Sequence, residues 1–452
     1  MKNDMLTGKP VKTISSFALP IMFSSLLQFS YNFVDNIIVG RYVSTEALAA
    51  VGNIGSINSF IIGTALGLTS GFTIPVAQKF GAGDFKKMNK YAGNSISISF
   101  IIGLFFVVVA HIVSNPILRL INTPDNIIEL SRAYINILYF GVPLQMLFNN
   151  FIGISRAVGN SKKPLMFLAV SVTVNFFLDI LLVKTLHFGV EGAAAATVLS
   201  YLCATLFAGF YVLKIEKSVS ISKRDLLPDF KTSIEQLKLG VPVSLQFTIT
   251  SVGSMILQSA VNSFGSSAIA ALTAAGRVEQ ILNLPMSALG VANATFVAQN
   301  YGAGNYSRII DAVKKILLLD ACVCVCCSGV LAWAGPYAVR LFMDSYDAQI
   351  MQYAKQYLYT IAACYIFVCL LFVFRNTLQG LGFTYANTIA GAGELIGRMV
   401  VSFLLTPAFG FKAVCFAGPF AWVLADIPLI VIYLKKKKQF SCISQNQFLE
   451  RG

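Results

Sequence analysis

Val-Ala-Gln-Lys-Phe-Gly-Ala-Gly at residues 76–83 returns as Val-Ala-Gln-Asn-Tyr-Gly-Ala-Gly at residues 297–304, a shift of 221 residues. The chain is therefore an internal duplication. In an apolar chain, duplicated halves are typical of a transporter whose substrate site lies where the repeats meet. Four shorter pairs keep nearly the same shift: Leu19-Pro20 with Val241-Pro242, 47–50 with 268–271, Arg119-Leu120 with Arg340-Leu341, and Phe188-Gly189 with Phe409-Gly410.

The composition is that of a membrane protein, because 56% of the 452 residues are hydrophobic and only 12% are charged. Charge-poor runs of about 20 residues recur along the chain, each long enough to cross a bilayer as a helix. We therefore predict an all-α integral membrane protein with twelve transmembrane helices, six in each half, and no soluble catalytic domain. The runs lie near residues 14–38, 48–75, 91–113, 132–154, 165–183, 192–213, 236–261, 268–297, 312–335, 354–378, 386–406 and 411–434.

These spans predict four segments of the chain. An N-terminal six-helix lobe covers residues 1–213, and a C-terminal six-helix lobe covers residues 239–434. A charged cytoplasmic linker at residues 214–238 joins them, and a basic cytoplasmic tail follows at residues 435–452.

The distribution of basic residues predicts the orientation of the chain. Of the 31 Lys and Arg residues outside the predicted spans, 24 fall in alternate connections, and the other three of the 34 lie inside spans. This asymmetry predicts that both termini are cytoplasmic. The formal charge of +14 does not indicate nucleic-acid binding, because no basic patch with interleaved aromatic residues is present. The lysine run 435–438 is better suited to anionic lipid.

Ionisable residues inside the predicted spans need an explanation, because each costs roughly 2.5–3.5 kcal/mol on insertion scales. In the first half, Asp35, Asp179 and Thr197 each lie five or six residues from a charged residue at the predicted outer end of a span. At about 1.5 Å per residue they share a depth of roughly 8–9 Å below that surface. Asn175 lies one helical turn from Asp179. We predict an oxygen-lined pocket for H⁺ or Na⁺ rather than two isolated hydrogen bonds to neighbouring helices.

The second half carries a different pattern of intramembrane charge. Glu394 and Arg398 are spaced i,i+4 on one span, which predicts a structural ion pair. Arg277 and Glu279 are two residues apart and cannot face each other on a helix, so one or both could reach a central cavity. Asp426 lies closer to the end of its span.

Several motifs together resemble those of the multidrug and toxic compound extrusion (MATE) transporters, and the likeness covers nearly the whole chain. The motifs are the Gln-x-x-Gly-Ala-Gly turns at Gln78 and Gln299, Val-Asp-Asn-Ile-Ile-Val-Gly at 34–40, Leu284-Pro285, and Gly-Val-Glu-Gly-Ala-Ala-Ala-Ala-Thr at 189–197. The resemblance implies two pseudo-symmetric six-helix bundles. It also implies an antiporter in the cell membrane that exports cationic or amphipathic compounds in exchange for H⁺ or Na⁺.

The spacing Asn175-x-x-x-Asp179 followed by Thr197 looks like the DinF-type branch, in which the equivalents of these residues and of Asp35 form the cation site. The seventh span departs from the NorM-type branch, because it carries Thr250 where that branch has a glutamate. The resemblance therefore gives no support for a second cation site there. Gln246 and Gln258 on the same span could line the cavity.

An enzyme embedded in the membrane is disfavoured, because the sequence offers no His, Cys or metal constellation near a cavity. We expect a monomer without a cofactor, with small organic substrates and the lipid bilayer as its partners. H⁺ is the favoured coupling ion, because burial and mutual repulsion let two close carboxyls hold a proton. Na⁺ is the alternative, and it would be the protein's metal ion. The alternative function is that of a lipid-linked oligosaccharide flippase of the same superfamily. Its cavity is usually richer in cationic residues than this first half.

Overall fold

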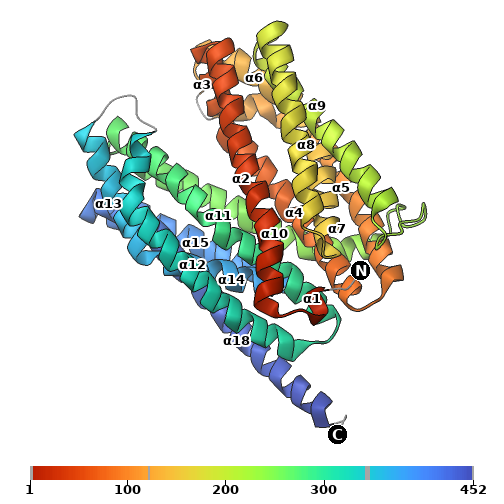
Figure 1. Ribbon diagram of the computed structural model, residues 1–452. Coiled ribbons are helices and arrows are strands. Elements are labelled where there is room, and N and C mark those ends of the chain that lie inside the picture. Colours follow the sequence, from red (N-terminus) through yellow and green to blue (C-terminus); the bar gives the residue numbers. More distant parts are fainter. Residues whose placement is uncertain (1–3, 121–122, 342–346, 450–452) are drawn as a thin grey trace. The chain divides into compact units, whose positions relative to one another are not determined.

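The computed structural model describes residues 4–120, 123–341 and 347–449, and all regular secondary structure in this part of the chain is helical (Figure 1). Ten helices in it are long and apolar enough to cross a membrane. Two further helix pairs, bent by 46° and 55°, raise the number to twelve if each pair is one span. The predicted all-α, twelve-helix membrane architecture is confirmed.

The chain divides into two compact units. Residues 23–244 form one, called here the N-unit, and residues 1–22 together with 245–452 form the other, called the C-unit. Both divisions fall inside a helix, at positions 22 and 244, whereas the sequence-predicted segments end at 213 and begin again at 239. Each division lies two residues after a proline within the helix, Pro20 in one and Pro242 in the other.

The helices of the N-unit follow the order of the predicted spans, and α8 and α9 run side by side in it (Figure 1). They are α2 (Pro10–Tyr42, from residue 23), α3 (Thr45–Asn53), α4 (Gly55–Gly81), α5 (Phe85–Leu120), α6 (Asp125–Phe140), α7 (Val142–Ala157), α8 (Lys162–Asp179), the π-helix η1 (Ile180–Thr185), α9 (Gly189–Phe210), the π-helix η2 (Tyr211–Ile215) and the start of α10 (Phe230–Asn262).

The C-unit repeats this order in outline, and several of its helices have nearly the same length as their counterparts, such as α5 with 36 residues and α12 with 35. It contains α1 (Asp4–Thr7), the first residues of α2, the rest of α10, α11 (Ser266–Gly302), α12 (Tyr306–Arg340), α13 (Ala348–Cys364), α14 (Ile366–Gly380), α15 (Tyr385–Met399), the π-helix η3 (Val400–Leu405), α16 (Thr406–Phe409), α17 (Phe411–Cys415) and α18 (Ala417–Leu449).

The duplicated Gly-Ala-Gly motif forms the same turn in both units. Gly83 and Gly304 each have φ +72°, a conformation that favours glycine. The amide of Gly83 donates to the Phe80 carbonyl oxygen at 3.1 Å, and the amide of Gly304 donates to that of Tyr301 at the same distance. Together with a second bond from the following residue, this is the Schellman arrangement that ends a helix. Each Gly-Ala-Gly motif thus ends a helix with a tight turn.

The start of α10 is fixed to the N-unit by buried polar contacts. The Asn94 amide donates to the Gln236 side-chain oxygen at 2.7 Å, and Gln236 donates to the Phe72 carbonyl oxygen at 2.9 Å. A Cβ atom on Gly71 would lie 2.3 Å from the Cα atom of Gly240, so the backbones of α4 and α10 touch there. The last nine residues of the predicted linker, 230–238, thus belong to α10.

Asp229 caps this helix from outside the membrane spans. Its carboxylate accepts a hydrogen bond from the Thr232 backbone amide at 2.9 Å and pairs with Lys90 at 3.1 Å. The hydrogen bonds from Thr232, with help from Lys90, lower the pKa of Asp229 to about 2.

Candidate functional site

Asp35 and Asp179 meet inside the N-unit. Asp35 lies on α2 and is 9% exposed, and Asp179 is the last residue of α8 and is 1% exposed. Their carboxyl groups interact with each other at hydrogen-bonding range. Oδ1 of Asp35 and both oxygens of Asp179 have no hydrogen-bond donor among the described residues. Two buried carboxyls at this range cannot both stay ionised without a cation between them, so the pair fits a shared proton or a bound cation.

A change of helix type places Asp179 at this point. The α-helix ends at Asp179, and the next six residues form the π-helix η1. The equivalent segment of the other repeat is also a π-helix, η3, which follows Met399. Wide turns of this kind often occur at functional sites, and here one begins directly after the buried acid.

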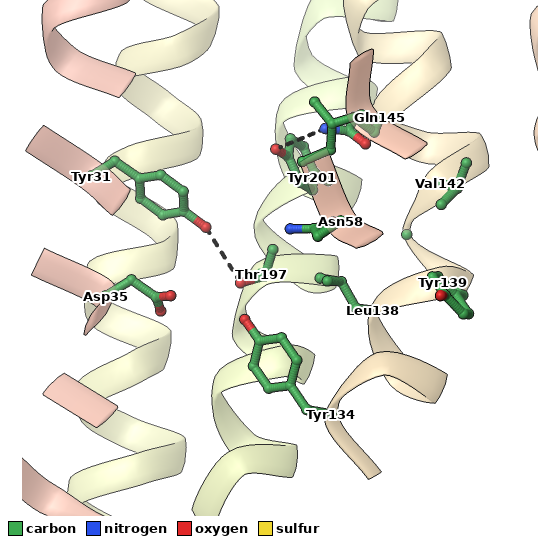
Figure 2. A pocket seen from close by; sticks show the side chains of 12 residues that line it. Tyr31, Asp35, Asn58, Tyr134, Leu138, Tyr139, Val142, Gln145, Thr197 and Tyr201 are labelled. Atoms are coloured by element: carbon green, nitrogen blue, oxygen red, sulfur yellow. Dashed lines mark hydrogen bonds between the residues drawn. The ribbon is translucent and has the colours of Figure 1, made fainter. Parts of the chain in front are cut away.

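A cavity of about 90 Å³ lies beside Asp35. Figure 2 shows Tyr31 and Asp35 on α2, Tyr134 on α6, and Thr197 and Tyr201 on α9 around it. The hydroxyls of Tyr31 and Thr197 are hydrogen-bonded at 3.3 Å. The described lining holds one carboxylate and no Lys or Arg side chain. The cavity is large enough for a few water molecules, each of which takes about 30 Å³ in the liquid, so it could give a proton a route to the carboxyl pair.

The sequence-predicted set is brought together in part. Asp35 and Thr197 line the same cavity, and Asp179 contacts Asp35 without lining it. Asn175 is 2% exposed and does not line the cavity, and its amide nitrogen has no acceptor among the described residues. Asn175 and Asp179 are one helical turn apart on α8, so the Asn175 side chain would lie near any cation bound by Asp179.

Four tyrosines of the cavity are missing from the predicted set: Tyr31, Tyr134, Tyr139 and Tyr201. Tyr31 lies one helical turn before Asp35, and Tyr201 lies one turn after Thr197, so helical spacing from the predicted residues could have found both. Tyr134 comes from α6, and no spacing rule connects that helix to Asp35. Its ring is 5% exposed, and its hydroxyl interacts electrostatically with both carboxyls of the pair.

Glu394 in the C-unit belongs to a network larger than the predicted pair. It lies 3.8 Å from Arg398, but its closer ion-pair partner is Arg375 on α14. The Thr250 hydroxyl donates to the second Glu394 carboxylate oxygen at 3.2 Å. Arg398 also donates to the Thr250 carbonyl oxygen at 2.6 Å. The predicted cavity residue Gln246 is buried against this network, with its amide donating to Thr250 at 3.3 Å.

A second cavity, of about 340 Å³, lies in the C-unit and is lined by Gln258, Glu279 and Arg398 among mainly apolar and aromatic side chains. The Tyr357 hydroxyl donates to Glu279 at 2.7 Å. Arg277 is exposed and is not among the lining residues. Two of the four predicted cavity residues, Gln258 and Glu279, therefore line this cavity, whereas Gln246 and Arg277 do not.

Among the residues that the structure describes, no three His, Cys, Asp or Glu side chains are grouped so that they could hold a metal ion. A cation at the Asp35–Asp179 pair would thus rely on two carboxylates and on neutral oxygens.

A protein-family model described as MatE matches residues 20–181 and 242–408, one stretch in each repeat. The chain belongs to the MatE family. As the resemblance to the MATE transporters predicted, it is a multi-pass membrane transport protein. The two matched stretches include Asp35 and Asp179 in the first repeat, and Arg375 and Glu394 in the second.

Proteins of Bacillus and Staphylococcus are similar to this chain over most of its length. The "Probable multidrug resistance protein YpnP" of Bacillus subtilis (strain 168) is 31% identical over 84% of each chain. The "Multidrug export protein MepA" of Staphylococcus haemolyticus is 25% identical over 93% of each chain.

Among solved structures, that of "MATE in complex with MaL6" has a TM-score of 0.88 at 24% identity and covers 98% of this chain and 100% of that one. A transporter of the MOP superfamily from Pyrococcus furiosus has a TM-score of 0.87 at 23% identity, with 98% and 99% covered. These likenesses show the MATE fold.

Proposed function

We propose that this MatE protein is an antiporter that exports organic cations or amphipathic compounds by alternating access, driven by H⁺ entering through the Asp35–Asp179 pair. The observation that carries the proposal is the contact between two buried carboxyls whose oxygens lack donors among the described residues. Ionisable groups buried in a membrane protein are costly, and in transporters they mark ion pathways.

The substrate class rests on the relatives. YpnP and MepA are both named for multidrug resistance or export, and they match most of this chain. The C-unit cavity supports the amphipathic part of this class, because its lining is mainly apolar and aromatic, with side chains such as Tyr357 and Trp422, and also holds Glu279 and Arg398. A largely apolar wall with a few charged and polar groups suits an amphipathic molecule.

Coupling follows from the charge state of the pair. With one proton shared, Asp35 and Asp179 attract each other and hold α2 close to the end of α8. When that proton leaves, two carboxylates at hydrogen-bonding range repel, and the helices that carry them separate. A ligand or proton shifts a conformational equilibrium only by the difference in its affinity for the two states. Here the proton prefers the state in which the two carboxyls touch.

H⁺ is favoured over Na⁺ because a hard cation prefers a shell of several oxygens, and the pair brings two carboxylates. The Thr197 hydroxyl and the Asn175 amide oxygen could complete part of a sodium shell, so Na⁺ is the alternative ion. A flippase for a lipid-linked oligosaccharide is less well supported, since the described lining of the N-unit cavity contains no Lys or Arg to meet a diphosphate.

Transport by purified protein in sealed liposomes tests the proposal. Ethidium, a fluorescent organic cation, is the probe, and either a proton gradient without sodium or a sodium gradient at equal pH is imposed. We expect proton-driven transport that Asp179→Asn and Asp35→Asn each abolish while the protein stays folded. Glu191→Gln is the matched control, because Glu191 is exposed and lies on the same helix as Thr197.

Two results would contradict the proposal in different ways. Full transport by a well-folded Asp179→Asn variant would remove the carboxyl pair from the mechanism. Transport that needs sodium and ignores the proton gradient, but is still lost in Asp179→Asn, would keep the site and replace the ion.

A further inference from the structure

Two acidic side chains of the C-unit are fully buried and have no role in the function proposed above. Asp320 on α12 is 0% exposed, and Asp426 on α18 is 3% exposed. All four of their carboxyl oxygens lack a hydrogen-bond donor among the described residues. Asp320 is absent from the sequence-predicted set, although it lies inside the predicted span 312–335.

A single thiol lies close to both acids. Cys369 on α14 interacts directly with Asp320 and electrostatically with Asp426. Its own hydrogen bond goes to the carbonyl oxygen of Leu317, with the sulfur 4.0 Å from that oxygen. The thiol is a weak donor with one proton, which is shared between the Leu317 carbonyl oxygen and Asp320.

The charged and titratable neighbours of the two acids differ. Asp320 interacts with the thiols of Cys369, Cys324 and Cys327. Asp426 interacts with Arg375 of α14 and Glu394 of α15, as well as with Cys369. Arg375 favours an ionised Asp426, but the like charge of Glu394 opposes it. The groups that interact with Asp320 are thiols.

The equivalent positions of the N-unit show which side chains are sufficient for packing at these two places. With the shift of 221 residues, Asp320 corresponds to Ser99 and Asp426 to Thr205. The Ser99 hydroxyl accepts a hydrogen bond from the Asn150 amide at 3.2 Å. The Thr205 hydroxyl donates to the Leu144 carbonyl oxygen at 3.0 Å. A small hydroxyl with a partner is sufficient at both places in the N-unit, so packing does not require an acid in the C-unit.

A buried carboxylate without a donor is far more costly than the neutral acid, so each side chain is stable here when it carries a proton or meets a cation. The described residues offer no group of three metal-ligating side chains. We propose that Asp320 and Asp426, which both lie near Cys369, are proton-binding residues of the C-unit that stay protonated at neutral pH. Their protonation does not depend on the coupling role proposed for Asp35 and Asp179.

Infrared difference spectroscopy of the purified full-length protein in lipid tests the proposal without transport. A protonated carboxylic acid has a carbonyl stretch that shifts in D₂O and is absent from a carboxylate. At neutral pH we expect Asp320→Asn and Asp426→Asn each to lose one such band. Asp311→Asn is the matched control, because Asp311 lies on the same helix in an exposed pair with Lys315 and should lose no band.

A second variant keeps the test decisive if either asparagine variant fails to fold. Cys369→Ala removes the thiol beside Asp320, so it should shift the Asp320 band and leave the Asp426 carbonyl protonated. Carboxylate signals in place of these bands at neutral pH would overturn the proposal. Loss of both wild-type bands on adding Na⁺ at constant pH would also overturn it, because the site would then bind sodium.

Discussion

Glu394→Gln should destabilise the C-unit more than any other single charge removal discussed here. Glu394 has a side-chain exposure of 4%, and the two guanidinium groups that it neutralises are each 13% exposed. Glutamine keeps the shape of the side chain but leaves Arg375 and Arg398 without their carboxylate. Removing one partner of a buried pair costs about 3–5 kcal/mol of the free energy of unfolding.

The lower end of that range applies here. Arg398 keeps its bonds to the Thr250 carbonyl oxygen at 2.6 Å and to the Ser254 hydroxyl at 2.9 Å. Arg375 is therefore the main source of the loss, and Asp426 can offset part of it by ionising. We expect a loss of about 3 kcal/mol. For units of 150–250 residues this lowers Tm by about 6–12 °C.

Intrinsic fluorescence can measure this loss in detergent, because both tryptophans of the chain, Trp333 and Trp422, belong to the C-unit. Adding Arg375→Met to Glu394→Gln removes the stranded cation, so the double variant should be more stable than Glu394→Gln alone. Arg375→Lys is not a suitable rescue, because it keeps the charge. A Tm for Glu394→Gln within 2 °C of wild type, or a double variant no more stable than the single one, would refute this account of the network.

Three further outcomes are expected. Gly71→Val should prevent accumulation of folded protein, because a Cβ atom there would overlap the backbone at Gly240. Gly52→Val should be tolerated, because nothing lies within 4 Å of a Cβ atom at that position. The yield of detergent-solubilised protein and gel filtration compare the two variants. Asp229→Asn should lower Tm at pH 7. Since the pKa of Asp229 is lowered to about 2, its stabilising effect is complete above about pH 4 and is lost as the pH falls toward 2, so the two Tm values should converge there. A single cysteine at position 225 should be protected from an impermeant thiol reagent in intact cells and react after lysis, and labelling in intact cells would invert the predicted topology.

The fold could be predicted from the sequence because its signals are local and repeated. Twelve apolar runs and a duplicated turn are visible without any knowledge of which helices touch. The sequence also predicted a common depth for Asp35 and Asp179, because the helical rise per residue converts a residue's distance from the end of its span into a depth in the membrane. Their direct contact requires α2 and the end of α8 to be neighbours, and height alone cannot establish that.

The partners of Glu394 show the limit of local spacing. The i,i+4 rule identifies Arg398, but the closer cation is Arg375, which is 19 residues away on a different helix. Asp320 was missed for a related reason. Its neighbours in sequence are apolar, and its isolation becomes visible only when every buried oxygen is matched with a donor.

The positions of Pro20 and Pro242 have a mechanical consequence. The chain passes between the units twice, each time within one continuous helix and two residues after a proline. Proline removes a backbone hydrogen bond from a helix and lets it bend. Each connection between the units is thus a continuous helix with one potential hinge at its proline. Because of the duplication, the two hinges lie at matching positions of the two repeats. A movement of one unit would act on the other through these two helices, so a bend at Pro20 in α2 would be expected to accompany a bend at Pro242 in α10.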